Sequence, residues 1–179
     1  MHPTAEVKTV VASTIRSAFE YQGQKCSACS RVYVPESLWG EIKEGLVETQ
    51  KSLKMGSATD ADTFMSAVID RKAFDRISGY IKHAKASPDC SIVAGGGYDD
   101  SVGYFIEPTI VQTTTPTDKC FQEEIFGPLV TVYVYPDKVG SFLYLFHDHP
   151  NHLPLGHPEH PGVGHHPLTL LPHWSSLLQ

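Results

Sequence analysis

Three stretches of the chain carry apolar residues at intervals of three and four positions, which is the repeat of one helix face. The first covers residues 4–21, with Thr4 as the predicted N-cap and an end before Gly23. The second begins at Ser37 and ends near Gly56, and Pro88 stops the third. The inner faces are Val7, Val10, Val11, Ile15, Ala18 and Phe19; Leu38, Ile42, Leu46 and Leu53; and Phe74, Ile77, Ile81 and Ala84.

Strand patterns lie between and after these helices. β-Branched and aromatic residues fill positions 31–34, and an apolar run over 91–94 leads through Gly95, Gly96 and Gly97 toward a second run over 104–111. No helix with a Lys-Ser/Thr start follows the glycines, so we interpret them as a turn between two strands rather than a phosphate-binding loop. The strongest pattern covers 129–135, where valines alternate with Thr and Tyr. Helices alternating with strands predict an α/β fold.

The composition changes near Lys138. Residues 1–139 hold 32 of the 34 charged residues, whereas residues 140–179 hold eight of the ten histidines and six of the thirteen prolines. Frequent proline prevents regular structure, so we divide the chain into a folded part, 1–139, and a His/Pro-rich tail, 140–179, and expect disorder after about residue 147. His147, His149 and His152 could offer imidazoles to zinc or copper, but the tail has few groups to orient them, and we predict no specific metal site.

Net charge, the length of apolar runs and cysteine spacing exclude several classes of function. A net charge of −6 leaves no basic surface for nucleic acid or for an anionic membrane, and no apolar run is long enough to span a bilayer. The first residues lack the basic start and apolar stretch of a targeting segment. Four cysteines at irregular spacing do not form a disulfide framework, which favours a soluble protein in a reducing compartment.

Cys26 is the first candidate for chemistry. It follows a predicted helix end and precedes small residues, a setting in which the backbone turns sharply and presents a thiol as a nucleophile. Lys25 could favour the thiolate, whereas the alternative is a small buried core cysteine. Cys26 and Cys29 also form C-x-x-C, which leaves redox and zinc interpretations open, although no second closely spaced pair completes a zinc site.

Glu123 and Glu124 form the second candidate, because they lead into Phe126 and a rigid Gly-Pro turn. This arrangement can place a carboxylate and an aromatic ring at the edge of a cleft. A carboxylate can accept hydrogen bonds from both hydroxyls of a nucleotide ribose, as in dinucleotide-binding folds. Ordinary surface charge is the alternative.

Three motifs, in this order and spacing, resemble the aldehyde dehydrogenase superfamily. They are FEYQGQKCSACSR at 19–31, GYFIEPT at 103–109 and EEIFGP at 123–128. The residues around Cys26 are similar to the glutamate-semialdehyde (1-pyrroline-5-carboxylate) dehydrogenase branch, enzymes of the mitochondrial matrix. The similarity covers about residues 2–139 and implies a partial catalytic domain of the aldehyde dehydrogenase fold followed by the unstructured tail.

The resemblance implies NAD-dependent oxidation of L-glutamate γ-semialdehyde to L-glutamate in proline catabolism. Cys26 corresponds to the nucleophile that forms a thioester, and its backbone N–H to part of the oxyanion hole. Glu124 corresponds to the carboxylate that holds the nicotinamide-side ribose, with Phe126 packing beside it to position the ring.

Other parts of the family pattern have no counterpart in this sequence. The dinucleotide-binding domain, the oxyanion-hole asparagine and the general-base glutamate precede the matched region, and the oligomerisation hairpin of the homo-oligomeric family follows it. We therefore expect a fragment that is inactive alone toward its aldehyde substrate. A non-enzymatic interaction module is the alternative, and a metal-binding tail is a third interpretation.

Overall fold

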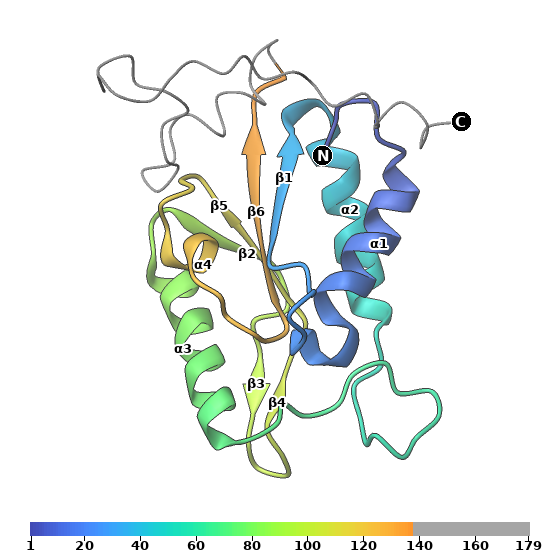
Figure 1. The fold of residues 1–179 in the computed structure, drawn as a ribbon, viewed down its shortest axis with the longest axis vertical. Helices are drawn as coiled ribbons and strands as arrows, with labels where there is room; N and C mark the ends of the chain where they lie inside the picture. The colour runs from blue at the N-terminus through green and yellow to red at the C-terminus, as the bar shows by residue number, and fades with distance from the viewer. Residues whose placement is uncertain (138–179) are drawn as a thin grey trace, which may run out of the picture.

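A computed structural model of the chain describes residues 1–137, in which helices alternate with strands as the sequence predicted (Figure 1). The helices are α1 (Val7–Phe19), the 3-10 turn η1 (Glu20–Gly23), α2 (Glu36–Ser52), α3 (Arg71–Ala86) and α4 (Lys119–Gln122). The strands are β1 (Arg31–Pro35), β2 (Cys90–Ala94), β3 (Tyr98–Asp99), β4 (Phe105–Ile106), β5 (Thr109–Thr113) and β6 (Leu129–Tyr135).

A four-stranded sheet in the order β1-β6-β5-β2 forms the centre of the molecule. The strand β6 pairs in parallel with β1 and with β5, while β2 is antiparallel to β5 at the edge. The strongest sequence pattern, residues 129–135, is therefore an interior strand of the sheet, and its bounds are confirmed. Parallel strands covered on both faces are rich in β-branched residues, which explains the run of valines.

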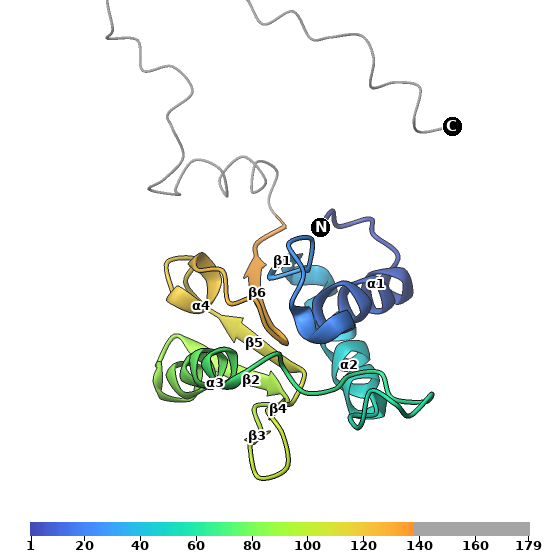
Figure 2. The same ribbon diagram turned by 60° about the horizontal axis from the view of Figure 1, so that its bottom comes forward.

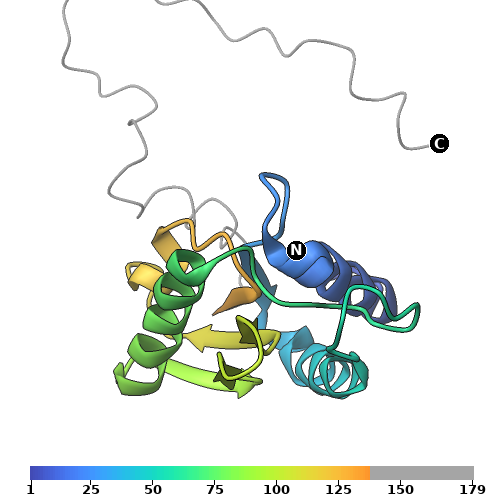
Figure 3. The same cartoon turned by 90° about the horizontal axis from the view of Figure 1, so that it is seen from below.

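Two hydrophobic cores lie on the two faces of the sheet. The pair α1 and α2 covers one face, and α3 with the short α4 covers the other (Figures 2 and 3). Successive residues of a strand point to opposite faces, so Ile110 joins the α1–α2 core while Val111 joins the α3 core. The fold is thus a layered α/β arrangement, as predicted.

Two predicted helix caps are wrong. Helix α1 begins at Val7, and the Glu6 carboxylate, not Thr4, accepts the N–H groups of Lys8 and Thr9 at 3.1 and 2.6 Å. Thr4 lies two residues before this N-cap position, and its hydroxyl contacts His2 Nδ1 at 2.9 Å instead. Helix α2 begins one residue before Ser37, whose N–H and hydroxyl donate to Asp137 at 2.7 and 2.9 Å.

The glycine-rich segment is a bend and not the tip of a hairpin. Gly95, with φ +72°, turns the chain out of β2, and a Cβ atom there would lie 2.2 Å from the Pro108 carbonyl oxygen. The chain then forms a small two-stranded excursion of β3 and β4 before β5 begins (Figure 1). The predicted strand over 104–111 is accordingly divided, with Glu107 and Pro108 between its halves.

The predicted tail, its histidines and the predicted disorder after residue 147 lie outside the described residues. Within residues 1–137, no helix has both the length and the apolar character needed to cross a bilayer.

Candidate active site

The Cys26 thiol is exposed on a tight turn. The Ala28 N–H donates to the Lys25 carbonyl at 3.0 Å, which places Cys26 and Ser27 at the two central positions of the turn. The interpretation of Cys26 as a buried core cysteine is therefore wrong. The accessible setting that nucleophilic attack requires is present.

The backbone before this turn is unusual. Tyr21 and Gln22 in η1 have φ angles of 55° and 56°, in the left-handed region that non-glycine residues rarely adopt. After the turn, the Cys29 N–H donates to the Ser17 carbonyl at 2.9 Å and the Thr131 N–H donates to the Ser30 carbonyl at 3.0 Å. The turn is thus anchored to α1 on one side and to β6 on the other.

The side chains of Lys25 and Cys29, which are close to Cys26 in the sequence, each have a partner of their own. Lys25 Nζ is 3.2 Å from Glu20 Oε2, so this cation has a carboxylate partner of its own. Cys29 is half-buried, and its thiol donates to the Arg31 carbonyl at 3.4 Å. Burial raises the pKa of the Cys29 thiol. The two cysteines of the C-x-x-C pattern therefore have different environments, and none of the four cysteines, all within the described residues, forms a disulfide.

The loop between α4 and β6 alternates between buried and exposed residues. Ile125 is buried, and its carbonyl accepts a hydrogen bond from Arg76 Nε at 3.3 Å. On either side, Glu124 is exposed and Phe126 keeps 39% of its surface exposed. Phe126 has φ 54°, which turns the chain before Gly127. Glu124 and Phe126 are thus both exposed, on either side of the buried Ile125.

The adjacent carboxylates Glu123 and Glu124 have different partners. The Tyr80 hydroxyl donates to Glu123, and this hydrogen bond, with burial and the Glu123 charge, raises the pKa of Tyr80 to about 12. Glu124 makes no hydrogen bond or ion pair through its carboxylate within residues 1–137. Both oxygens of Glu124 are therefore available to a ligand. Nothing in the sequence indicated Tyr80, because it lies 43 residues from Glu123.

Two glycines bring the candidate segments together. A Cβ atom added to Gly23 would lie 2.3 Å from the Gly127 carbonyl oxygen, so the two backbones are in direct contact. Gly127 in turn packs on Ile77 of α3, where an added Cβ would lie 2.4 Å from Cδ1. Because Cys26 closely follows Gly23 and Glu124 closely precedes Gly127, the thiol turn and the carboxylate loop are neighbours.

These features agree with the comparisons to known proteins. The sequence model of the aldehyde dehydrogenase family matches residues 1–139, and the chain belongs to this family. It is 58% identical over 139 residues to the mitochondrial delta-1-pyrroline-5-carboxylate dehydrogenase of Danio rerio, and 56% identical over 138 residues to that of Homo sapiens. The alignments cover 77% and 76% of this chain but 25% and 24% of those proteins. The chain thus spans about a quarter of the length of these relatives.

Solved structures of dehydrogenases also match this chain. Delta-pyrroline-5-carboxylate dehydrogenase from Mycobacterium tuberculosis matches with a TM-score of 0.72 and 41% identity, over 76% of this chain and 25% of that one. A structure of the same enzyme bound with NAD matches with a TM-score of 0.69 and 39% identity, over 76% and 24%. Betaine aldehyde dehydrogenase from Staphylococcus aureus in complex with NAD⁺ matches with a TM-score of 0.71 and 32% identity, over 75% and 27%. The family resemblance and the fold are confirmed.

Proposed function

We propose that this chain is part of an NAD-dependent dehydrogenase that oxidises L-glutamate γ-semialdehyde, the open form of 1-pyrroline-5-carboxylate, to L-glutamate in mitochondrial proline breakdown. The relatives that are 56–58% identical are named mitochondrial delta-1-pyrroline-5-carboxylate dehydrogenases. The observation that carries the proposal is the direct contact of Gly23 with Gly127, which makes neighbours of an exposed thiol turn and an exposed carboxylate loop.

In this proposal Cys26 is the nucleophile. Its thiolate forms a carbon–sulfur bond to the aldehyde carbonyl, and the Cys26 backbone N–H donates to the resulting oxyanion. When bound, NAD would supply the acceptor for the hydride that this hemithioacetal carbon loses. The thioester then remaining on Cys26 is hydrolysed by water, which releases L-glutamate and restores the thiol.

Glu124 and Phe126 form the proposed nicotinamide-side ribose site. The fit rests on the exposed Glu124 carboxylate, whose two oxygens have no protein partner within residues 1–137 and match the two ribose hydroxyls in number and polarity. Phe126 offers an apolar surface beside them, with 39% of the residue exposed. The buried Ile125 anchors the loop backbone between these two residues.

The 179 residues on their own are proposed to have negligible turnover. The family resemblance assigns the general base and the main dinucleotide-binding surface to parts of the enzyme outside the matched quarter. General-base catalysis contributes about 10² to 10⁴ in rate, and positioning of the reactants contributes up to about 7 to 11 kcal/mol. The alternative of a non-enzymatic interaction module shares this expectation, so activity has to be tested in a complete framework.

A chimeric enzyme provides that framework. Residues 1–137 replace the matched quarter of the Mycobacterium tuberculosis relative, and NADH formation is measured with L-glutamate γ-semialdehyde. We expect turnover by the chimera, little by the isolated chain, and none by the chimera with Cys26→Ser. A folded chimera without Cys26-dependent activity would favour the interaction module instead.

A further inference from the structure

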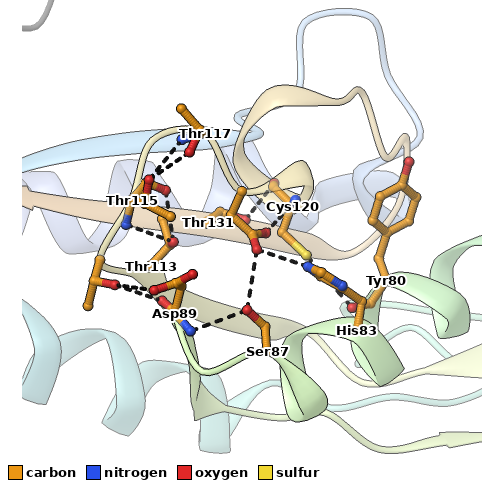
Figure 4. A network of polar contacts seen from close by, with 11 residues as sticks. Tyr80, His83, Ser87, Asp89, Thr113, Thr115, Thr117, Cys120 and Thr131 are labelled. Carbon is orange, nitrogen blue, oxygen red and sulfur yellow. Dashed lines mark hydrogen bonds and ion pairs between the residues drawn. The ribbon is translucent and has the colours of Figure 1, made fainter. Parts of the chain in front are cut away.

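A second cluster of potential ligands lies on the α3 face of the sheet. It consists of His83 on α3, Asp118 directly before α4, and Cys120 within α4. One ligand atom from each residue lies within 4.8 Å of the other two, and His83 Nε2 is 2.9 Å from Asp118 Oδ2. His83 and Cys120 point toward each other in Figure 4.

The cluster is more enclosed than an ordinary surface ion pair. The side chain of Asp118 keeps 6% of its surface exposed and that of His83 keeps 30%, while Cys120 is 1% exposed. The Asp118 Oδ1 atom caps α4 by accepting the Cys120 N–H at 2.8 Å, while Oδ2 faces His83 and also accepts from the Ser87 hydroxyl at 3.5 Å. A carboxylate is thus buried with an imidazole and a thiol beside it, and the imidazole edge gives access from solvent.

We propose that His83 Nε2, Asp118 Oδ2 and Cys120 Sγ form a zinc-binding site. Imidazole nitrogen, carboxylate oxygen and thiolate sulfur are the three ligand types that zinc takes in proteins. Tetrahedral zinc at ordinary bond lengths places such ligands about 3.3 to 3.6 Å apart, whereas the present separations are 2.9 Å for the nitrogen and oxygen and at most 4.8 Å for the others. Side-chain movements of about 1 Å are sufficient to bring the three ligand atoms to the separations that tetrahedral zinc requires.

The chemistry of the ligands determines which protons leave when zinc binds. The Cys120 thiol proton is released to solvent when the sulfur binds zinc, and the proton that His83 Nε2 shares with Asp118 has to leave Nε2, either to Nδ1 of the same ring or to solvent. The fourth position is left for water or for the Cys90 thiol, which neighbours the Asp118 carboxylate. This proposal departs from the predicted absence of a specific metal site. His83 lies 35 positions before Asp118 in the sequence, so the ligands meet only in the fold.

The position of the site indicates a structural role. Zinc bound there would connect the C-terminal turn of α3 to α4, and α4 leads directly into Glu123 and Glu124. The metal would therefore hold the start of the loop that presents the proposed ribose carboxylate.

Cobalt(II) is the probe, with the full 179-residue chain under reducing conditions. Cobalt bound to a thiolate gives a sulfur-to-metal charge-transfer absorption that histidine ligands do not produce, so the eight histidines beyond residue 140 do not interfere. We expect the absorption to saturate at one cobalt per chain and to disappear when zinc is added. It should be lost in Cys120→Ala and kept in the matched control Cys26→Ser. Loss of a direct ligand in His83→Gln should weaken binding at least about tenfold.

The site would be overturned by a charge-transfer absorption that survives Cys120→Ala, by one that disappears in Cys26→Ser, or by the lack of any such absorption at saturating cobalt. His83→Gln keeps the test decisive if Cys120→Ala unfolds, because His83 is partly exposed, and unchanged cobalt affinity in that variant contradicts the proposal.

Discussion

Gly23 and Gly127 contact each other through their backbones, and neither position has room for a side chain. The missing Cβ of Gly23 would overlap the Gly127 carbonyl oxygen at 2.3 Å, and the missing Cβ of Gly127 would overlap Ile77 at 2.4 Å. This contact positions the Cys26 turn relative to the loop that carries Glu124 and Phe126. The geometry of the proposed active site therefore depends on two residues that have no side chain.

Replacement of Gly23 by alanine should lower the free energy of unfolding by about 2 kcal/mol or more, because φ is +64° and the new Cβ meets backbone atoms. Gly40→Ala in α2 is the matched control. No atom lies within 4 Å of its added Cβ, and helical alanine should raise stability by about 0.5 to 1 kcal/mol. Urea unfolding measures the free energy of unfolding of both variants. Equal stability of Gly23→Ala and the wild-type protein would mean that the contact is not close.

Periodicity predicted the fold well because the pattern of apolar residues encodes it directly. The valines of β6 alternate along a strand, and Ile77 and Ile81 repeat along a helix, so local spacing specifies each element. The caps were harder to predict. Thr4 and Ser37 are good capping residues, but Glu6 has two oxygens at the right position and Asp137 binds Ser37 from a distant part of the chain.

The candidate site could be predicted only in part. The motifs identified Cys26, Glu124 and Phe126 by resemblance, and the structure shows all three exposed. Contacts between distant segments, such as Tyr80 with Glu123 or His83 with Asp118, have no local signal. The sequence predicted one turn between the strands 91–94 and 104–111 and did not predict β3 and β4. The close approach of Gly95 to Pro108 is again a contact between distant segments.

The Tyr80–Glu123 hydrogen bond should be visible in a pH titration. It raises the pKa of Tyr80 to about 12, so the neutral phenol is favoured in the folded state. The resulting stability is present below the ordinary tyrosine pKa of about 10 and is lost as the pH rises through about 12. Subtracting the ultraviolet titration of Tyr80→Phe from that of the wild type isolates this residue. Glu123→Gln should shift the difference curve to lower pH, and an unshifted curve would exclude the bond.

Glu124 and Glu123 form a matched pair for testing the cofactor site. In the chimeric enzyme, Glu124→Gln should raise the KM for NAD or lower kcat by about tenfold, because a charge-assisted hydrogen bond contributes about 1.5 to 3 kcal/mol. Glu123→Gln should change both values much less, since Glu123 binds Tyr80. Equal effects of the two substitutions would show that Glu124 has no special role.

The four thiols should differ in their rates of alkylation. Cys26 is exposed and should react first with iodoacetamide, while Cys29 and Cys90 are half-buried and burial raises the pKa of both thiols. Cys120 should react last, since burial and the Asp118 charge raise its pKa to about 12. Peptide mass spectrometry at successive times gives the order. Early labelling of Cys120 in the folded protein would contradict its buried position.

The central claim is that Cys26 carries the acyl intermediate. The most direct measurement is mass spectrometry of the chimeric enzyme after acid quenching during turnover, with fragmentation to separate Cys26 from Cys29. The account predicts an acyl group derived from glutamate semialdehyde on Cys26, present with NAD and absent without it. An acyl group on Cys29, or an active enzyme that retains full turnover after Cys26→Ser, would contradict the account.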